Sequence, residues 1–137
     1  MKTISIAEDI LVMYVTATSF PGGIMDAHEK IHAMLPASSA SRKYYGISRP
    51  ENKKIVYRAA VEVLHSNEPA TFQLETLILK RGNYISLLIK DYTKDVQSIG
   101  SAFDELLSHP HLDPGGYCVE WYLDNNKDVL CMIRLAN

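Results

Sequence analysis

The feature that most constrains the fold is an internal repeat. Shifted forward by 73 positions, residues 44–62 (YYGISRPENKKIVYRAAVE) align without a gap on residues 117–135 (YCVEWYLDNNKDVLCMIRL). Few identities survive, but in both copies a helical pattern precedes the aligned segment, and an apolar strand pattern precedes the helix. The chain therefore predicts two tandem copies of strand–helix–strand–strand, at about residues 1–64 and 72–137.

The pattern of each copy predicts an α+β module, in which one helix packs on an antiparallel sheet. In the first copy we expect two strands joined by a turn at Glu8-Asp9, then a helix and a hairpin, at residues 3–7, 10–17, 24–35 and 43–64. In the second copy we expect an opening hairpin that turns at residues 80–83, then a helix and a closing hairpin, at residues 73–89, 95–107 and 117–135.

Composition limits the class of protein. With 137 residues, 47% of them hydrophobic, the whole chain predicts a single domain with a real core. Fourteen basic and sixteen acidic residues give a net charge of −2 with no basic run, which argues against direct binding to DNA or RNA. Two acids interrupt the apolar N-terminal stretch, and no eighteen apolar residues run together. We therefore expect a cytoplasmic protein without a secretory signal or a membrane span.

The two cysteines, Cys118 and Cys131, both fall in apolar strand patterns. They could be neighbours on adjacent strands. Reduced, buried thiols are the expectation for a cytosolic protein.

Two strand segments are apolar on both faces. Residues 55–57 and 129–133 lack the alternation of apolar and polar side chains that half-exposed strands show. One face would carry the helix of the same copy, and the opposite copy would cover the other face. We therefore expect an apolar, aromatic groove between the two copies, because seams between subdomains are common small-molecule sites.

Glu120 interrupts the apolar pattern of the segment CVEWY (residues 118–122). The shift of 73 places Glu120 where the first copy has Ile47. Burial of a lone carboxylate costs free energy unless it is paired or its pKa rises. A salt bridge to Arg58 or Arg134, or a solvated position at a sheet edge, would explain this residue.

The alternative explanation is that Glu120 faces a ligand. A carboxylate in an aromatic surround attracts cationic and hydrogen-bonding compounds, because rings add stacking and cation–π contacts. Tyr122 would lie on the same face of the strand, and Tyr45 or Tyr57 would come from the other copy. Trp121 would point to the opposite face and is a further candidate ligand contact.

Three segments carry a resemblance to a known family: Gly82-Asn83-Tyr84 entering a strand, residues 99–107 (IGSAFDELL) in the second helix, and residues 116–122 (GYCVEWY) before the last hairpin. With the duplication, they resemble the gyrase-inhibitor-like fold, which is also the effector-binding domain of bacterial multidrug-responsive transcription activators. The resemblance implies a ligand pocket between two tandem modules and makes Glu120 its central acid.

Activators of that family carry a DNA-binding region before this domain, for which the chain has no room. We expect a free-standing domain that senses or sequesters an amphipathic, aromatic or cationic compound, without a cofactor and with an unknown protein partner. Free-standing members of the wider family are associated with hydrolysis of reactive cyclopropane-bearing toxins. The alternative is therefore a hydrolase with Glu120 as general base and Tyr122 or Tyr45 as proton donor. A third hypothesis is a module that binds a peptide in an open groove.

His28-Glu29-Lys30-Ile31-His32 matches the H-E-x-x-H pattern, in which two imidazoles on one helix face bind zinc and the glutamate acts as base. The repeat argues against a zinc hydrolase. A shift of 72 aligns the histidines with Gly100 and Asp104, on the flank of the apolar face of the second helix. We therefore expect solvent-facing imidazoles and no metal site.

Overall fold

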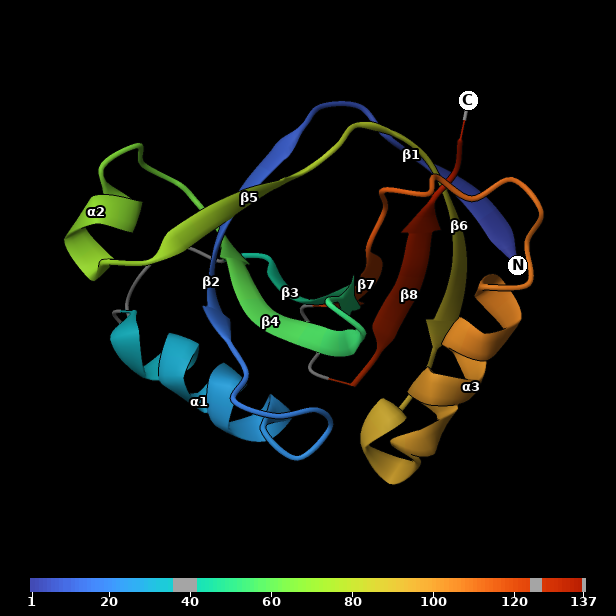
Figure 1. The fold of residues 1–137 in the computed structure, drawn as a ribbon, viewed down its shortest axis with the longest axis horizontal. Helices are drawn as coiled ribbons and strands as arrows, with labels where there is room; N and C mark the ends of the chain where they lie inside the picture. Colours follow the sequence, from blue (N-terminus) through green and yellow to red (C-terminus); the bar gives the residue numbers. More distant parts are fainter. Residues whose placement is uncertain (36–41, 124–126, 137) are drawn as a thin grey trace. The chain divides into compact units, whose positions relative to one another are not determined.

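The computed structural model describes residues 1–35, 42–123 and 127–136 (Figure 1). The chain divides into two compact units. We call residues 10–79 the central unit, and residues 1–9 together with 80–137 the split unit. The chain is α+β, as predicted, and its strands pair antiparallel within each unit.

The central unit is a four-stranded antiparallel sheet with one long helix and one short helix (Figure 1). Its strand order is β3-β4-β2-β5. Helix α1 packs on β2 and β4. The bounds are β2 Ile10–Thr16, α1 Ile24–Met34, β3 Tyr44–Glu51, β4 Lys54–Glu62, α2 Glu68–Phe72 and β5 Glu75–Leu79.

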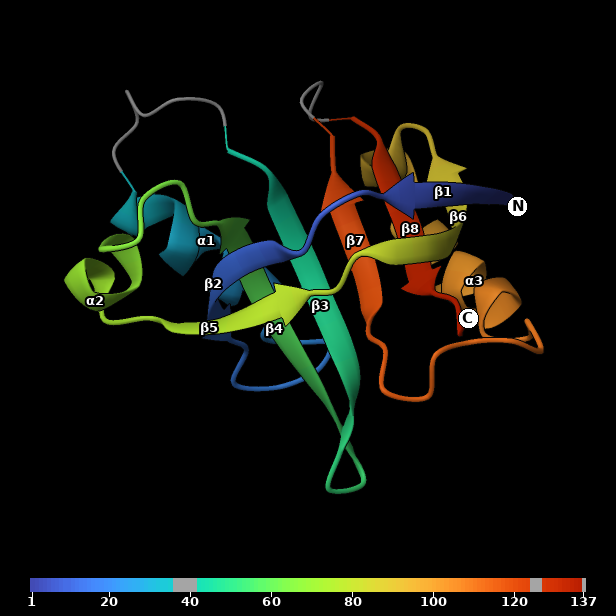
Figure 2. The same ribbon diagram turned by 90° about the horizontal axis from the view of Figure 1, so that it is seen from above.

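The split unit also has a four-stranded antiparallel sheet, in the order β1-β6-β8-β7. Helix α3 lies against β6 and β8 (Figure 2). The bounds are β1 Lys2–Ile6, β6 Gly82–Ile89, the 3-10 helix η1 Tyr92–Lys94, α3 Gln97–Leu106, β7 Cys118–Tyr122 and β8 Val129–Arg134. Among the helices of the described residues, none has the length and apolar character needed to cross a bilayer.

The two predicted opening hairpins are wrong. Strand β1 pairs with β6, and β2 pairs with β5, so the consecutive strands β1–β2 and β5–β6 are not partners. The favoured two-residue hairpin turns need positive φ, and neither Glu8 nor Asp9 has it. Instead, the Asp9 carboxylate accepts the backbone N–H of Arg81 at 2.8 Å. The alternating pattern predicted these strands, but it did not predict their partners.

Each helix covers an apolar core in its own unit. Ala27 and Ile31 of α1 pack on buried residues of β2 and β4, which are Met13, Ala59 and Val61. Ala102 and Leu106 of α3 pack on buried residues of β6 and β8, which are Ile85, Val129, Cys131 and Ile133. The other faces of β4 and β8 also carry buried residues, such as Ala60 and Met132. Strand β8 is therefore buried on both faces over residues 129–133, as its sequence predicted. In β4 the prediction for residues 55–57 is wrong at Ile55, which is 43% exposed, and both faces are buried only farther along the strand.

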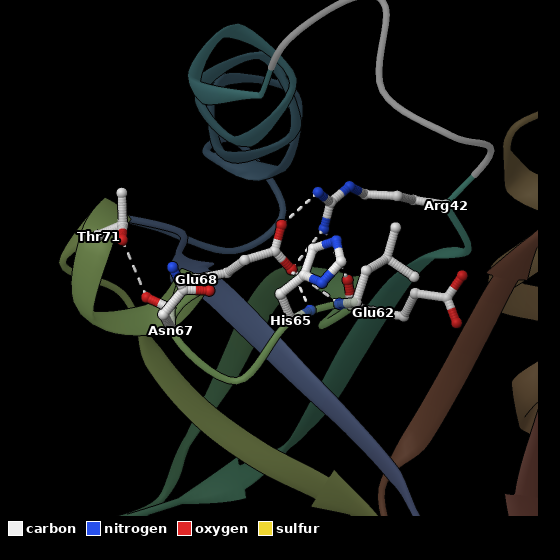
Figure 3. Close-up of polar contacts among 7 residues, drawn as sticks. Arg42, Glu62, His65, Asn67, Glu68 and Thr71 are labelled. Atoms are coloured by element: carbon white, nitrogen blue, oxygen red, sulfur yellow. Dashed lines mark hydrogen bonds and ion pairs between the residues drawn. The ribbon is translucent and has the colours of Figure 1, made fainter.

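A buried ion pair ties the start of β3 to α2 (Figure 3). The Arg42 guanidinium donates to both carboxylate oxygens of Glu68, through Nη1 at 2.9 Å and through Nη2. The backbone N–H groups of Leu64 and His65 donate to Glu68 Oε1 at 2.7 and 3.0 Å. Only 5% of the Arg42 side chain and 10% of the Glu68 side chain are exposed. The hydrogen bonds from Arg42 lower the pKa of Glu68 to about 2, although burial alone would raise it.

We expect Glu68→Gln to lower the free energy of unfolding by about 3 kcal/mol at neutral pH, because it leaves a buried guanidinium without its counter-charge. The pKa of Glu68 lies below its ordinary value of 4.5. The stabilisation is therefore complete above that value and is lost as the pH falls through about 2. Urea denaturation at neutral pH and at about pH 3 measures both effects. The exposed control Glu105→Gln should change stability by less than about 0.5 kcal/mol. A pH-independent difference between Glu68→Gln and wild type would contradict the ionised pair.

The pairing of β2 with β5 can be tested by a disulfide. Leu11 and Ile78 lie directly opposite each other and are 40% and 50% exposed. Their Cβ atoms should be about 4.5–5.5 Å apart, so Leu11→Cys/Ile78→Cys should crosslink under mild oxidation. Leu77 faces the other side of β5, so the control Leu11→Cys/Leu77→Cys should stay reduced. Non-reducing electrophoresis and mass spectrometry of the linked peptides measure the outcome. Equal crosslinking of both variants would contradict this register.

Candidate ligand-binding site

Strand β7 holds Glu120 and Tyr122 in contact with each other. The Tyr122 hydroxyl donates a hydrogen bond to Glu120 Oε1. Both side chains are half-buried. In the register with β8, Glu120 lies opposite Cys131 and Tyr122 lies opposite Val129. The predicted pairing of this acid with an aromatic residue two positions along the strand is therefore present in the structure.

The face on which Glu120 lies differs from the expectation. Cys118 and Tyr122 pack against the apolar core beneath α3, and Cys131, opposite Glu120, belongs to that core. Because alternate residues of a strand share a face, Glu120 also lies on the α3 side of the sheet. The hypothesis that Glu120 faces a ligand in the groove had implied the face away from the helix. Trp121 lies on the face away from α3, opposite to Glu120 as strand alternation requires, but not on the helix side where the ligand hypothesis placed it.

The error comes from the repeat alignment. The shift of 73 equates Glu120 with Ile47, but Ile47 lies on the face of β3 away from α1, since Tyr44 packs on the α1 side. A slip of one residue moves every side chain of a strand to the opposite face. A shift of 74 equates Glu120 with Gly46, which shares the helix-side face with Tyr44.

Tyr92 is a site residue that the sequence analysis missed. Its ring centroid lies 5.6 Å from that of Tyr122, with the ring planes tilted by 58°. Short helix η1 holds it there, because the Tyr92 N–H donates to the carbonyl of Lys127 at 2.9 Å. The Asp91 N–H donates to Asp128 Oδ1 at 3.1 Å. Tyr92 follows Asp91, whose positive φ of 51° interrupts any regular helix or strand pattern. Only the three-dimensional structure therefore identifies Tyr92 as a site residue.

The charge of Glu120 acts on three neighbouring groups. Burial and this carboxylate together raise the pKa of Tyr92. They also raise the pKa of the Cys118 thiol to about 11, and with Cys118 as a third cause they raise that of Cys131 to about 12. Both cysteines are free thiols, as predicted. The site therefore combines one carboxylate with two phenol rings and two neutral thiols.

The two arginines considered as salt-bridge partners of Glu120 pair with other carboxylates. Arg58 donates to Glu51, at 2.7 Å through Nη1 and 3.1 Å through Nη2. Arg134 donates to Asp113 Oδ2 at 3.0 Å. Glu120 itself accepts the hydrogen bond from the Tyr122 hydroxyl.

Tyr45 and Tyr57 belong to the central unit and lie on opposite faces of its sheet. Tyr45 is completely buried on the face away from α1. Tyr57 is buried on the α1 side, where its hydroxyl lies 2.7 Å from His28 Nε2. The ring of Phe20 stacks on Tyr57 with 6.2 Å between centroids. The α1 side of this sheet therefore carries Tyr57, and the opposite face carries Tyr45.

The two histidines of the H-E-x-x-H pattern contact tyrosines. His28 is half-buried rather than solvent-facing, and burial followed by the nearby His32 lowers its pKa to about 4. His32 is exposed, as predicted, and its ring stacks on Tyr44 with 4.1 Å between centroids. Within residues 1–35, 42–123 and 127–136, no three His, Cys, Asp or Glu side chains group closely enough to hold a metal ion. A third zinc ligand for the histidines is therefore missing from the described part of the chain.

No family model and no curated protein matches this sequence. Solved structures do share its fold. SAV2435 bound to tetraphenylphosphonium is 12% identical, with a TM-score of 0.62 over 97% of this chain and 93% of the other. A hydrolase from Listeria innocua is 8% identical, with a TM-score of 0.61 over 98% and 90%. A protein from Staphylococcus aureus MU50 assigned to bacterial transcription regulation is 11% identical, with a TM-score of 0.59 over 97% of both chains. The fold therefore occurs in ligand-binding and regulator-related proteins.

The charge of Glu120 can be tested through Cys118. A thiol with a pKa near 11 is almost entirely protonated at neutral pH, so we expect slow alkylation by iodoacetamide. Glu120→Gln removes the negative charge and should lower this pKa, which raises the thiolate fraction and speeds alkylation severalfold at about pH 9. Mass spectrometry of the Cys118 peptide measures the rate, with Glu105→Gln as the control. An unchanged rate in Glu120→Gln would show that no carboxylate charge acts on this thiol.

Proposed function

We propose that this chain is a small-molecule-binding domain for amphipathic aromatic cations, with Glu120 as the anionic group of the site. The observation that carries the proposal is the half-buried carboxylate of Glu120, which accepts the Tyr122 hydroxyl beside the ring of Tyr92. The proposed ligand places its cationic centre near the carboxylate and its rings against the tyrosines.

Physical chemistry favours this class of ligand. A carboxylate partly removed from water attracts a cation more strongly than a fully solvated one, because the surrounding dielectric constant is lower. Tyrosine faces add cation–π attraction of about 0.5–2 kcal/mol each. The neighbouring thiols are neutral and only weak hydrogen-bond donors, so they offer little to a strongly hydrated ion. A bulky cation with delocalised charge suits such a site better than a small inorganic ion.

The comparisons support the same class of ligand. SAV2435, which shares the fold, is bound to tetraphenylphosphonium, an aromatic cation. The resemblance to effector-binding domains of multidrug-responsive activators points to a sensor or a sequestering protein. Trp121 lies on the face of β7 opposite to Glu120, and Tyr45 and Tyr57 lie on opposite faces of the sheet of the central unit. The proposed ligand contacts are therefore Glu120, Tyr122 and Tyr92.

We expect tetraphenylphosphonium to raise the melting temperature of the wild type, because a ligand that binds only the folded state stabilises it by mass action. Glu120→Gln keeps the shape of the side chain and removes its charge, so the affinity measured by calorimetry should fall by about tenfold or more. Glu105→Gln is the matched control, since it removes an exposed carboxylate of the same unit. A neutral ligand of similar shape, such as triphenylmethane, should bind Glu120→Gln and wild type equally.

Two outcomes would overturn the proposal. Equal binding of the cation to wild type and Glu120→Gln would remove Glu120 from the site. Stabilisation by none of a panel of aromatic cations would favour a peptide-binding module, the third hypothesis of the sequence analysis.

A second candidate function is hydrolysis of a reactive small molecule. The hydrogen bond from Tyr122 to Glu120 favours it, because a carboxylate and a phenol in contact can act as base and proton donor. Glu120 would take a proton from water as the water oxygen attacks an electrophilic carbon, and Tyr122 would protonate the leaving atom. Incubation with a cyclopropane-bearing electrophile, followed by mass spectrometry, tests this. Product formation in wild type and its loss in both Glu120→Gln and Tyr122→Phe would support hydrolysis.

A further inference from the structure

The end of the β3–β4 hairpin is a cationic segment in an acidic chain. We define residues 49–58 as the basic ribbon. It contains four basic residues and one acid, so its charge is +3, while the remaining ten basic and fifteen acidic residues give the rest of the chain −5. The basic residues are Arg49, Lys53, Lys54 and Arg58, and the acid is Glu51. The positive charge of this segment is therefore local.

The basic ribbon has a defined shape. Its two strands stay paired to the tip, with Arg49 opposite Val56 and Glu51 opposite Lys54. Asn52 and Lys53 form the turn with φ of 51° and 68°. Strand β2 pairs with β4 only from Arg58 onward, so within the central unit the hairpin continues past β2 as a narrow two-stranded ribbon (Figure 2). A paired ribbon loses little conformational entropy when it binds a partner.

The cations of the basic ribbon gather on one of its faces. Alternation places Arg49 and Glu51 on the same face of β3. Lys54 and Arg58 of β4 lie opposite residues of that face, so they share it. The Glu51 carboxylate accepts a hydrogen bond from Arg58 at 2.7 Å and one from Arg49 at 3.2 Å. These bonds lower the pKa of Glu51 to about 2, and the bond from Arg58 has the larger effect. Arg58 is only 13% exposed and its charge is balanced by Glu51, so the cations that reach solvent are Arg49, Lys53 and Lys54.

We propose that the basic ribbon docks an acidic polypeptide segment of a partner protein. Charge complementarity selects an anionic partner. Three solvent-exposed cations are few beside the about 6–10 phosphate contacts through which a protein gains strong electrostatic affinity for a nucleic acid duplex. The −5 charge of the remaining chain would also repel a long polyanion. A short run of Asp and Glu residues can contact the ribbon alone and avoid that repulsion.

Fluorescence anisotropy with a labelled peptide of about twelve alternating Glu and Ser residues tests the proposal, at about 20 mM and about 150 mM salt. The test variant is Lys53→Asn/Lys54→Gln, in which asparagine tolerates the positive φ of the turn. The matched control, Lys90→Gln/Lys94→Gln, removes two exposed lysines of the split unit. We expect the wild type to bind at low salt, the test variant to lose about tenfold in affinity, and the control to lose less than about twofold.

Four outcomes would overturn the proposal. The first is no binding by the wild type at low salt, and the second is an equal loss in the control, which would indicate a general charge effect. The third is that the wild type binds a DNA duplex with the same number of negative charges more tightly than it binds the peptide. The fourth is salt-sensitive self-association of the wild type in sedimentation velocity that the test variant abolishes, which would make a second copy the occupant.

Discussion

The backbone pairing of β1 with β6, and of β2 with β5, is the constraint on which the rest of the structure depends. It assigns the first nine residues to the split unit, although the other residues of that unit begin 71 positions after Asp9, at Lys80. The sheet beneath α3 is therefore complete only when both ends of the chain have folded together. Such non-local pairing costs loop-closure entropy before it gains stability, which favours slow, cooperative folding. The Asp9 carboxylate that binds the Arg81 N–H fixes this arrangement where the chain leaves β1.

Register then decides the chemistry of the candidate site. With Glu120 opposite Cys131, the carboxylate lies on the α3 side, where the apolar core of the split unit packs. A shift of one residue would place Trp121 there and turn the carboxylate to the other face. The high pKa values of both thiols follow from this register, since burial and the Glu120 charge act on them together. The proposed preference for aromatic cations thus depends on which strand residues pair across β7 and β8.

The sequence predicted the local elements better than their partners. The strands, both long helices and the shared face of Glu120 and Tyr122 follow from periodicity, and periodicity is set by neighbours along the chain. Strand partners depend on residues 60 or more positions apart, and nothing in the alternation of β1 or β5 distinguishes one partner from another. Tyr92 was missed because its position comes from an irregular turn whose hydrogen bonds reach Lys127 and Asp128. His28 was misplaced because a flank position on a helix can still meet a buried hydroxyl, here that of Tyr57.

The distribution of charge connects the two proposals. The candidate ligand site presents a single carboxylate among rings and neutral thiols, while the basic ribbon concentrates three cations around one acid. Salt screens the interaction between surface charges beyond about 8 Å at physiological ionic strength. The Glu120 carboxylate and the basic ribbon therefore each attract or repel only a partner that comes close to them. An acidic peptide would be repelled by Glu120, and an organic cation would be repelled by Arg49 and Lys54. Opposite local charges in one nearly neutral chain therefore select two kinds of partner that carry opposite charge.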